Sequence, residues 1–453
     1  MIEVKLISQS TADPLCLAEK AAKTCYQPEA PILKETANQE VRDFIMNNIF
    51  RTGHHTVLEH QFFTFEIEGV AVSDVSFGLH LANPFYNSDQ RSGRFCAKMF
   101  DNPNTDWLDK YISYYWPKTQ GCVKRQIIDY FLDGIKTYRE LLPKATEVAL
   151  EQIKIERPKL SQEKMETLAP KIAQEQLRVF IPAMIPTGLV ISLDLTSILS
   201  LYKSAWTPVL KDITEKMRQE ITLNNPELDI FFEETGRLDK EWFPKIDSFF
   251  ESFSRHPKIS LKGVSLKNLK APKKLDLHPL DILQFSPEFM ENNCSFIKTR
   301  VAVSLMTFGQ DQRHRTIKRD RPSFTGSFYL PPLVSKLIKG KHKRLFVNWL
   351  DHLRLIMPPT LHTAIAPFGA MVSYEKAGNI NALIHEQGKR LCFNAQEEIY
   401  NLSVKLRRLL EKRLGSNHEL LSFLSPPCMI DGKCGEGKRF CGRFIKDFPK
   451  RIV

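Results

Sequence analysis

Apolar and polar residues alternate from position 63 to 68, where the chain reads FTFEIE, and this period of two predicts a half-buried strand. A strand is also expected at 2–7, with helices through 18–25 and 41–50. Residues 395–414 carry leucine and isoleucine at helical spacing and end at Gly415, which is suited to cap a helix. Strands mixed with long amphipathic helices predict an α+β chain.

The sequence also contains an internal repeat. Residues 70–78 read VAVSDVSFG and residues 301–309 read VAVSLMTFG, a match at six of nine positions with an offset of 231. Later segments pair at an offset of 185, so that Arg178 corresponds to Thr363 and Asp194 to Asn379. Because the second offset is 46 smaller, the first copy holds 46 additional residues, expected as a surface insertion around 101–159.

Each copy retains residues that the other has lost. The second copy has Arg313-His314-Arg315 where the first has Ala82-Asn83-Pro84. Conversely, the first copy has Ser92-Gly93-Arg94 where the second has Ser323-Phe324-Thr325. This division predicts one composite site, assembled from two unequal halves.

The lysine-rich stretch 258–274 suggests where the two copies are joined. It reads as an exposed linker, either simply solvated or in contact with nucleic acid. The expected organisation is a first repeat at 1–255, a basic linker at 256–280, a second repeat at 281–425 and a tail rich in cysteine and lysine at 426–453.

Composition narrows the class of protein. With 453 residues, 42% of them apolar, the chain is long enough for about two domains with substantial cores. Its longest apolar stretch, 180–193, is broken by Pro182, Pro186 and Gly188, so no membrane-spanning helix is expected. The first ten residues lack a secretory pattern, and nine cysteines without disulfide spacing fit a reducing cytoplasm. A net charge of +12 favours anionic partners, or else a solvated basic surface.

Several short segments carry candidate chemistry. Residues 53–60 read GHHTVLEH, which suits either a metal or a hydrogen-bonded structural cluster. The cations of 313–321 suit a diphosphate, because guanidinium groups bind phosphate oxygens bidentately, or they form an exposed basic stretch. The SGR triplet at 92–94 suits a nucleotide monophosphate. Cys428, Cys434 and Cys441 leave a zinc site open, although their spacing is not that of a standard finger.

Together these segments resemble the flavin-dependent thymidylate synthases, the ThyX family. Residues 53–60 and the FTFEIEG of 63–69 match the family's opening motifs. In the first repeat, SGR at 92–94 matches the end of the family signature R-H-R-x-x-S-x-N-x-x-S-x-R, and Arg178 stands four residues before Pro182 as in R-x-x-L-P. In the second repeat, RHR at 313–315 matches the start of that signature, and Arg390 with AQEEI at 395–399 matches the last motif.

The resemblance implies reductive methylation of dUMP to dTMP, with methylenetetrahydrofolate as carbon donor, FAD as hydride source and NADPH as reductant. The family builds its active sites between subunits, so tandem repeats imply a pseudo-dimer, in which each repeat is an antiparallel sheet packed with long helices. One composite site would be competent. The reciprocal site, with Thr325, Thr363 and Ala205, is expected to be inactive. Self-association of the pseudo-dimer is expected, and neither membrane nor nucleic acid is an expected partner.

Roles of individual residues also follow from the resemblance. Arg390 would be catalytic, stabilising negative charge that develops on the uracil ring. The residues implied in dUMP binding are Gln90, Ser92, Gly93, Arg94, Arg178, Gln310, Arg313 and Arg390. Those implied in FAD binding are His54, Thr56, Glu59, Arg313, His314, Arg315 and Asn379.

Departures from the family pattern keep other functions open. Asn381 and Asn394 stand where the family has an arginine and a histidine, and Gln90 replaces an acidic residue, so FAD would be held differently. The basic linker and tail suggest an alternative, a flavin- and folate-dependent methyltransferase acting on uracil in RNA. The missing motifs suggest another, a nucleotide-binding homologue without turnover.

Overall fold

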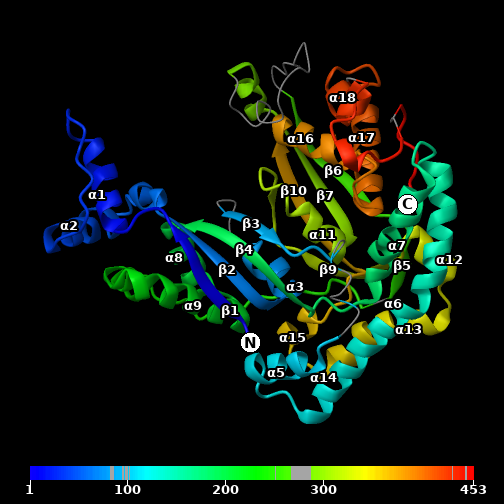
Figure 1. The fold of residues 1–453 in the computed structure, drawn as a ribbon, viewed down its shortest axis with the longest axis horizontal. Helices are drawn as coiled ribbons and strands as arrows, with labels where there is room; N and C mark the ends of the chain where they lie inside the picture. Colours follow the sequence, from blue (N-terminus) through cyan, green and yellow to red (C-terminus); the bar gives the residue numbers. More distant parts are fainter. Residues whose placement is uncertain are drawn as a thin grey trace.

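Two β-sheets, one from each half of the chain, organise the molecule (Figure 1). The computed structural model describes residues 1–81, 86–93, 96, 100, 103–249, 251–266, 287–430, 432–443 and 446–453. The first sheet has the order β1-β2-β4-β3, and its neighbouring strands are all antiparallel. Its strands are β1 (Glu3–Gln9), β2 (Phe62–Ala71), β3 (Tyr86–Gln90) and β4 (Pro186–Asp194).

The second sheet repeats this order along its path β6-β7-β10-β9. These four strands are antiparallel, whereas the short β5 joins β9 in parallel and β8 pairs with β10. The bounds are β5 (Ser252–Ser254), β6 (Lys258–Ser265), β7 (Phe296–Ser304), β8 (Lys318–Arg319), β9 (Ser323–Tyr329) and β10 (Ala370–Asn379). The α+β class is therefore confirmed.

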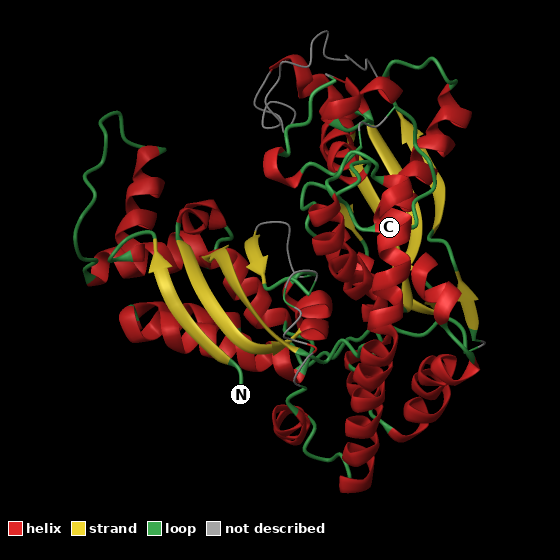
Figure 2. Cartoon of the chain, turned by 45° about the vertical axis from the view of Figure 1, so that its right-hand side comes forward, coloured by secondary structure: helices red, strands yellow, loops and turns green. Residues whose placement is uncertain are grey.

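Helices pack around both sheets (Figure 2). Those of the first half are α1 (Pro14–Thr24), α2 (Gln39–Phe44), η1 (Ile45–Phe50), η2 (His55–His60), α3 (Val72–Asp74), η3 (Val75–Leu79), α5 (Thr105–Tyr115), α6 (Gly121–Glu156), α7 (Gln162–Leu177), η4 (Arg178–Phe180), α8 (Leu195–Ser204), α9 (Pro208–Asn224), η5 (Pro226–Leu228) and α10 (Asp229–Thr235). Those of the second half are η7 (Pro287–Cys294), α11 (Leu305–Asp311), α12 (Pro332–Leu337), α13 (Gly340–Val347), η8 (Asn348–Leu353), α14 (Arg354–Ile356), α15 (Pro359–Ala364), α16 (Ile380–Arg390), α17 (Glu397–Leu414), α18 (Leu420–Phe423), α19 (Pro427–Ile430) and η9 (Gly437–Arg439).

Short polar side chains begin the equivalent helices α8 and α16. Asp194 ends β4, and its carboxylate accepts a hydrogen bond from the backbone N of Ser197 at 2.8 Å. Asn379 ends β10, and its Oδ1 accepts from the backbone N of Ala382 at 2.8 Å. Both residues are N-caps, which satisfy amides that the helix itself leaves without partners. Corresponding positions of the repeat therefore have the same structural role.

The helix expected at 395–414 is confirmed as α17, and Gly415 ends it with φ +92°, a conformation that glycine adopts readily. The strand and helices expected near the N-terminus are also present as β1, α1, α2 and η1. No described helix combines the length and the apolar character that crossing a membrane would require.

Residues 101–159, expected as a surface insertion, are instead partly core. Apart from residues outside the described ranges at 101 and 102, the segment forms α5 and α6. Helix α6 is 36 residues long, and it packs on α7, α12 and α13 with buried side chains that include Ile127, Phe131 and Tyr138. The expectation of a surface segment was wrong because these residues recur at helical spacing and form one buried face.

The expected linker at 256–280 is also corrected in part. Residues Lys258–Ser265 form β6, which pairs with β7 along its whole length. Ile259 and Leu261 alternate with lysines and pack against a hydrophobic cluster, so the lysines belong to the outer side of an edge strand. Residues 267–280 lie outside the described part of the chain.

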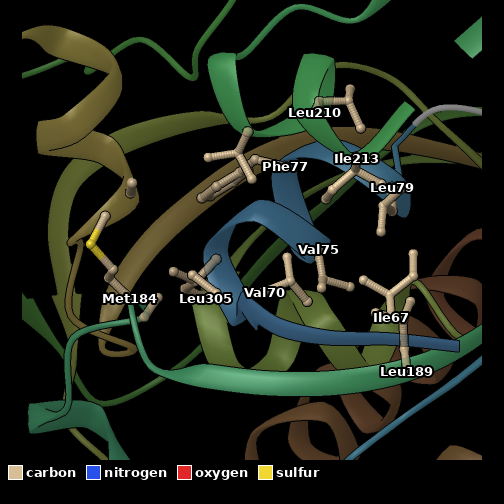
Figure 3. Packing of buried hydrophobic residues seen from close by; sticks show 14 of the residues in the cluster. Ile67, Val70, Val75, Phe77, Leu79, Met184, Leu189, Leu210, Ile213 and Leu305 are labelled. Atoms are coloured by element: carbon tan, nitrogen blue, oxygen red, sulfur yellow. The ribbon is translucent and has the colours of Figure 1, made fainter. Parts of the chain in front are cut away.

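The two halves share one hydrophobic core. Phe77 of η3 stacks on Phe308 of α11 with ring centroids 6.0 Å apart, and these are corresponding positions of the repeat. Figure 3 shows Leu305 of α11 in the same core as Phe77 and Met184. Because this core is continuous, the halves are fixed relative to each other by apolar burial.

Backbone hydrogen bonds join the halves in a reciprocal pair. The backbone N of Ala183 donates to the O of Ala366 at 2.8 Å, and the backbone N of Phe368 donates to the O of Ile181 at 2.9 Å. At the offset of 185, Ala183 corresponds to Phe368 and Ile181 to Ala366. Each segment thus donates one backbone hydrogen bond to the other and accepts the equivalent bond from it. This reciprocity is the pattern of an isologous interface.

Candidate functional site

A pocket of about 130 Å³ lies where η3 and α11 meet the ends of α7 and α16. Both halves contribute to its lining. The first half provides Val72, Ser76, Gln90, Arg91, Ser92, Gly93, Phe100, Arg178 and Ile185, and the second provides Leu305, Met306, Gly309, Gln310, Arg313, Phe368 and Arg390. Of the residues implied in dUMP binding, the structure brings all but one together here. Arg94 lies outside the described residues.

Four arginines from four different elements line this pocket. Arg91 follows β3, Arg178 follows α7, Arg313 follows α11 and Arg390 ends α16. Among the described lining residues, none is an aspartate or a glutamate. Converging guanidinium groups favour an anionic ligand with several oxygens, because each can donate two hydrogen bonds in one plane.

Arg178 is held against the short loop after β3. The residue is only 6% exposed, and its Nε donates to the backbone O of Glu175 at 3.4 Å. Its guanidinium lies 6.0 Å from the centroid of the Phe368 ring, across the boundary between the halves. The Nε2 of Gln174 donates to the backbone O of Gly93 at 3.1 Å, which fixes this loop beside Arg178. Gln174 and Phe368 were not found from the sequence.

A side chain at Gly93 would require its neighbours to shift by a few tenths of an ångström. A Cβ atom built there would lie 3.1 Å from Nη1 of Arg178 and 3.4 Å from the ring of Phe100. We therefore expect Gly93→Ala to displace the Arg178 guanidinium and to weaken binding of an anionic ligand about tenfold, with little change in thermal stability. Calorimetric titration of the variant measures this. Gly121→Ala is the control, because a Cβ there meets no atom within 4 Å. Equal affinities of both variants would contradict the expectation.

Arg390 and Gln310 form the opposite wall. The Nη2 of Arg390 donates to the backbone O of Gln310 at 2.6 Å, and the Nε2 of Gln310 donates to Oε1 of Gln396. The buried Oε1 of Gln310 accepts no hydrogen bond from any described residue. Gln396 is buried just before α17. The helix ends thus hold Arg390 beside an amide oxygen that can accept from a ligand.

The residues of the RHR segment point to three different surroundings. Arg313 lines the pocket, whereas Arg315 donates from Nη2 to the backbone O of Ser88 at 2.6 Å, in the first sheet. His314 is buried and meets His385 edge to face at 5.5 Å. Burial, with the positive charge of Arg390, lowers the pKa of His314 to about 2, so its ring is neutral.

The remaining residues implied in FAD binding lie elsewhere. His54, Thr56 and Glu59 are exposed at the start of β2, whereas the pocket lies beyond the other end of that ten-residue strand, roughly 30 Å away. Asn379 caps α16 at the end of β10 remote from Phe368. Within one chain His54, Thr56 and Glu59 therefore lie apart from the RHR segment, whereas Asn379 follows Gly378, which lies beside Ile317 just after that segment.

No group of three metal-binding side chains occurs among the described residues. That search covers the histidines of 53–60 and the tail residues Cys428, Cys434 and Cys441. Cys441 instead packs with Phe393 and Tyr400 in a small hydrophobic cluster.

On the other side of the interface, side chains occupy most of the place that is equivalent to the pocket. A cavity of only about 20 Å³ lies between η3 and α15, where it is lined by Trp116, Trp242, Phe243 and Thr363. The Nε1 of Trp116 donates to Oγ1 of Thr360 at 2.9 Å, which fixes the indole across this space. The volume is close to that of one water molecule. Among the described residues, the space on this side of the interface is therefore much smaller than the pocket of about 130 Å³ on the other side.

Comparison with known proteins identifies a related family. The α+β fold carries a cationic pocket that residues from both halves line. A family model described as thymidylate synthase complementing protein matches residues 5–209. This region of the chain is thus similar to the ThyX family.

Solved structures also show partial similarity. Thymidylate synthase X from Helicobacter pylori with FAD and dUMP is 14% identical over 52% of this chain and 99% of that chain, with a TM-score of 0.34. The UMP/dUMP methylase PolB from Streptomyces cacaoi bound with 5-Br dUMP is 17% identical over 52% of this chain and 97% of that chain, with a TM-score of 0.32. No curated relative matches the chain.

Proposed function

We propose that the chain binds dUMP in the composite pocket and catalyses its flavin-dependent methylation to dTMP. The observation that supports this most is the convergence of Arg178, Arg313 and Arg390 on one cavity from both halves. A phosphate is the ligand group that best matches several converging guanidinium groups. The similarity to the family supplies the reaction, and the positive pocket supplies the fit to a nucleotide monophosphate.

The proposed roles divide between the two halves. Arg178, with Ser92 and Gly93, binds the phosphate from the first half, and Arg313 binds it from the second. Gln310 accepts a hydrogen bond from the uracil through its Oε1. Arg390 places a fixed positive charge beside the uracil ring, where negative charge would develop near N3 during the reaction.

The proposed reaction requires three further compounds. Flavin supplies hydride, methylenetetrahydrofolate supplies the carbon and NADPH reduces the flavin. All three are anionic, as expected of ligands for a chain with a net charge of +12. Because the residues implied in FAD binding are divided between two regions, we assign to the chain's own residues only the binding and polarisation of the nucleotide.

We also propose that the chain is a tandem pseudo-dimer. The equal strand order of the two sheets, the matching caps Asp194 and Asn379, and the reciprocal backbone bonds across the interface support this. With β6 assigned to the second sheet, the second repeat begins near Lys258 rather than at 281. The filled reciprocal cavity supports a single competent site. Further self-association of this pseudo-dimer is part of the proposal.

Direct titration tests the proposed substrate. We expect purified protein to bind dUMP in the micromolar range or tighter, and to bind deoxyuridine at least about 30-fold more weakly, because the nucleoside lacks the phosphate that the arginines bind. Isothermal titration with both ligands measures the ratio. Equal affinities would contradict the phosphate assignment. A requirement for RNA in turnover would instead favour a uracil methyltransferase acting on RNA.

A further inference from the structure

A cluster of buried charges lies behind the pocket wall of the second half. Asp311 accepts from Arg319 Nε at 2.7 Å, from Lys376 Nζ at 2.8 Å and from the Tyr374 hydroxyl at 2.8 Å. Lys376 also donates to Oε1 of Glu386 at 2.7 Å. The side chains of Asp311 and Glu386 are at most 1% exposed and that of Lys376 is 6% exposed. We call these five residues the Asp311 cluster.

Burying these charges gives no general gain in stability. A well-packed set of apolar side chains is often as stabilising as a buried ion pair, or more so. Burial alone raises the pKa of Asp311, but attraction by Arg319 and Lys376 outweighs it and holds this pKa well below its usual range. The carboxylate is therefore ionised at neutral pH. Stability therefore does not account for the cluster. Its hydrogen bonds to the segments beside the pocket indicate a different role.

The Asp311 cluster fastens the segments that carry the pocket arginines. Arg319 donates from Nη1 to the backbone O of His314 at 3.0 Å and to that of Ile317 at 2.7 Å, which braces the loop after Arg313. Asp311 directly follows Gln310 at the end of α11. Glu386 lies one turn before Arg390 on α16. Through Lys376, the end of α11 and the helix of Arg390 are joined to the same strand, β10.

The first half has uncharged residues at the equivalent places. At the offset of 231 His80 corresponds to Asp311, and at the offset of 185 Leu201 corresponds to Glu386. Leu201 is buried, and burial lowers the pKa of His80 to about 3, so its ring is neutral and lies 2.7 Å from the Oγ of Ser88. The same backbone geometry is thus compatible with an uncharged set of side chains.

Strand pairing identifies the other counterparts. Ile191 pairs with Ser88 in the first sheet as Lys376 pairs with Arg319 in the second. Leu189 lies two residues before Ile191, as Tyr374 lies before Lys376. The five charged or polar residues of the second half therefore correspond to His80, Ser88, Leu189, Ile191 and Leu201. Only the half that contributes Arg313 and Arg390 to the pocket has the charged arrangement.

We infer that the Asp311 cluster is a positioning device, which holds Gln310, Arg313 and Arg390 in the one arrangement that binds the nucleotide. This inference rests on the proposed function, since dUMP is the ligand. The members of the cluster are not catalytic, because they act through the pocket residues.

The test replaces the cluster with the residues of the first half. The variant carries Asp311→His, Arg319→Ser, Tyr374→Leu, Lys376→Ile and Glu386→Leu. We expect it to fold with a Tm at or above that of the wild type, and to bind dUMP on the order of 100-fold more weakly. A single variant, Arg319→Lys, keeps a positive charge beside Asp311 but removes donors to the loop carbonyls. It is expected to fold and to bind dUMP about tenfold more weakly.

Asp212→Asn is the matched control. Asp212 accepts from Tyr115 at 2.5 Å and from Lys216 at 2.8 Å, in the first half and outside the pocket. Its variant should bind dUMP as the wild type does, whatever its Tm. Wild-type affinity in the folded five-residue variant, or in Arg319→Lys, would overturn the inference while leaving the proposed function intact. If the wild type itself does not bind dUMP, the proposed function fails, and the inference fails with it.

Discussion

Replacing Arg390 with alanine is expected to lower the rate of dUMP methylation by about 100- to 1000-fold. The guanidinium is fixed at the end of α16 by its hydrogen bond to the O of Gln310, so it stabilises charge without rearranging. Its removal should change the Kd for dUMP much less, because Arg178 and Arg313 still bind the phosphate. Anaerobic release of tritium from 5-tritiated dUMP, with FAD, NADPH and methylenetetrahydrofolate supplied, measures the rate.

Arg300→Ala is a suitable control for Arg390→Ala. Arg300 is exposed on β7 and donates to Ser373 outside the pocket, so its loss should leave the rate unchanged. If Arg390→Ala turned over within about tenfold of the wild-type rate, Arg390 would have no role in the chemical step. Loss of affinity as large as the loss of rate would make it a binding residue instead.

Alanine at either Arg178 or Arg313 is expected to weaken dUMP binding by about 30-fold or more, corresponding to roughly 2 kcal/mol or more. The two residues lie 135 positions apart in the sequence and belong to different halves, yet both line the one pocket. Since we propose that both bind the same phosphate, neither half alone should retain high affinity. Isothermal titration of the two variants, with Tm measured for each, gives the result.

Thr363→Ala tests whether the two sides of the interface differ. Thr363 occupies the place of Arg178 in the second half and lines the nearly filled cavity. Its variant should bind dUMP with wild-type affinity. If only one of the two arginine variants were weakened, the site would belong to one half, and the composite arrangement would be wrong.

Residues in short motifs were the most predictable part of the site. Arg178, Arg313 and Arg390 were identified by the motifs around them, and the repeat predicted that they would meet. The strand β2 and the helix α17 were also predictable, since their apolar residues recur with clear periods.

Contacts between distant segments were not predictable. Arg91 lines the pocket next to the SGR triplet, but its pairing with Glu68 at 2.5 Å depends on how β2 and β4 align. Gln174 holds the backbone of Gly93 across 81 positions of sequence. Lys376 could have been recognised as unusual from the sequence, because it interrupts the apolar side of a strand. Its partners could not, since Asp311 and Glu386 come from other elements.

The two corrections to the fold have different causes. The lysines near 258 suggested a solvated linker, although Ile259 and Leu261 between them already alternate as in an edge strand. Residues 101–159 were expected at the surface because the two offsets differ by 46, but an additional segment can still pack, and α6 buries one face along its 36 residues. The net charge of a segment indicates which ligands or partners it attracts. The spacing of its apolar residues indicates whether it packs against the core.

The number of dUMP molecules bound per chain tests the central claim most directly. Two similar halves that formed two equivalent sites would bind two nucleotides. The open pocket of about 130 Å³ and the filled reciprocal cavity of about 20 Å³ predict one. Isothermal titration of purified full-length protein should therefore give a stoichiometry of one dUMP per chain. A stoichiometry of two, or one that survives loss of both Arg178 and Arg313, would contradict a single site shared by the two halves.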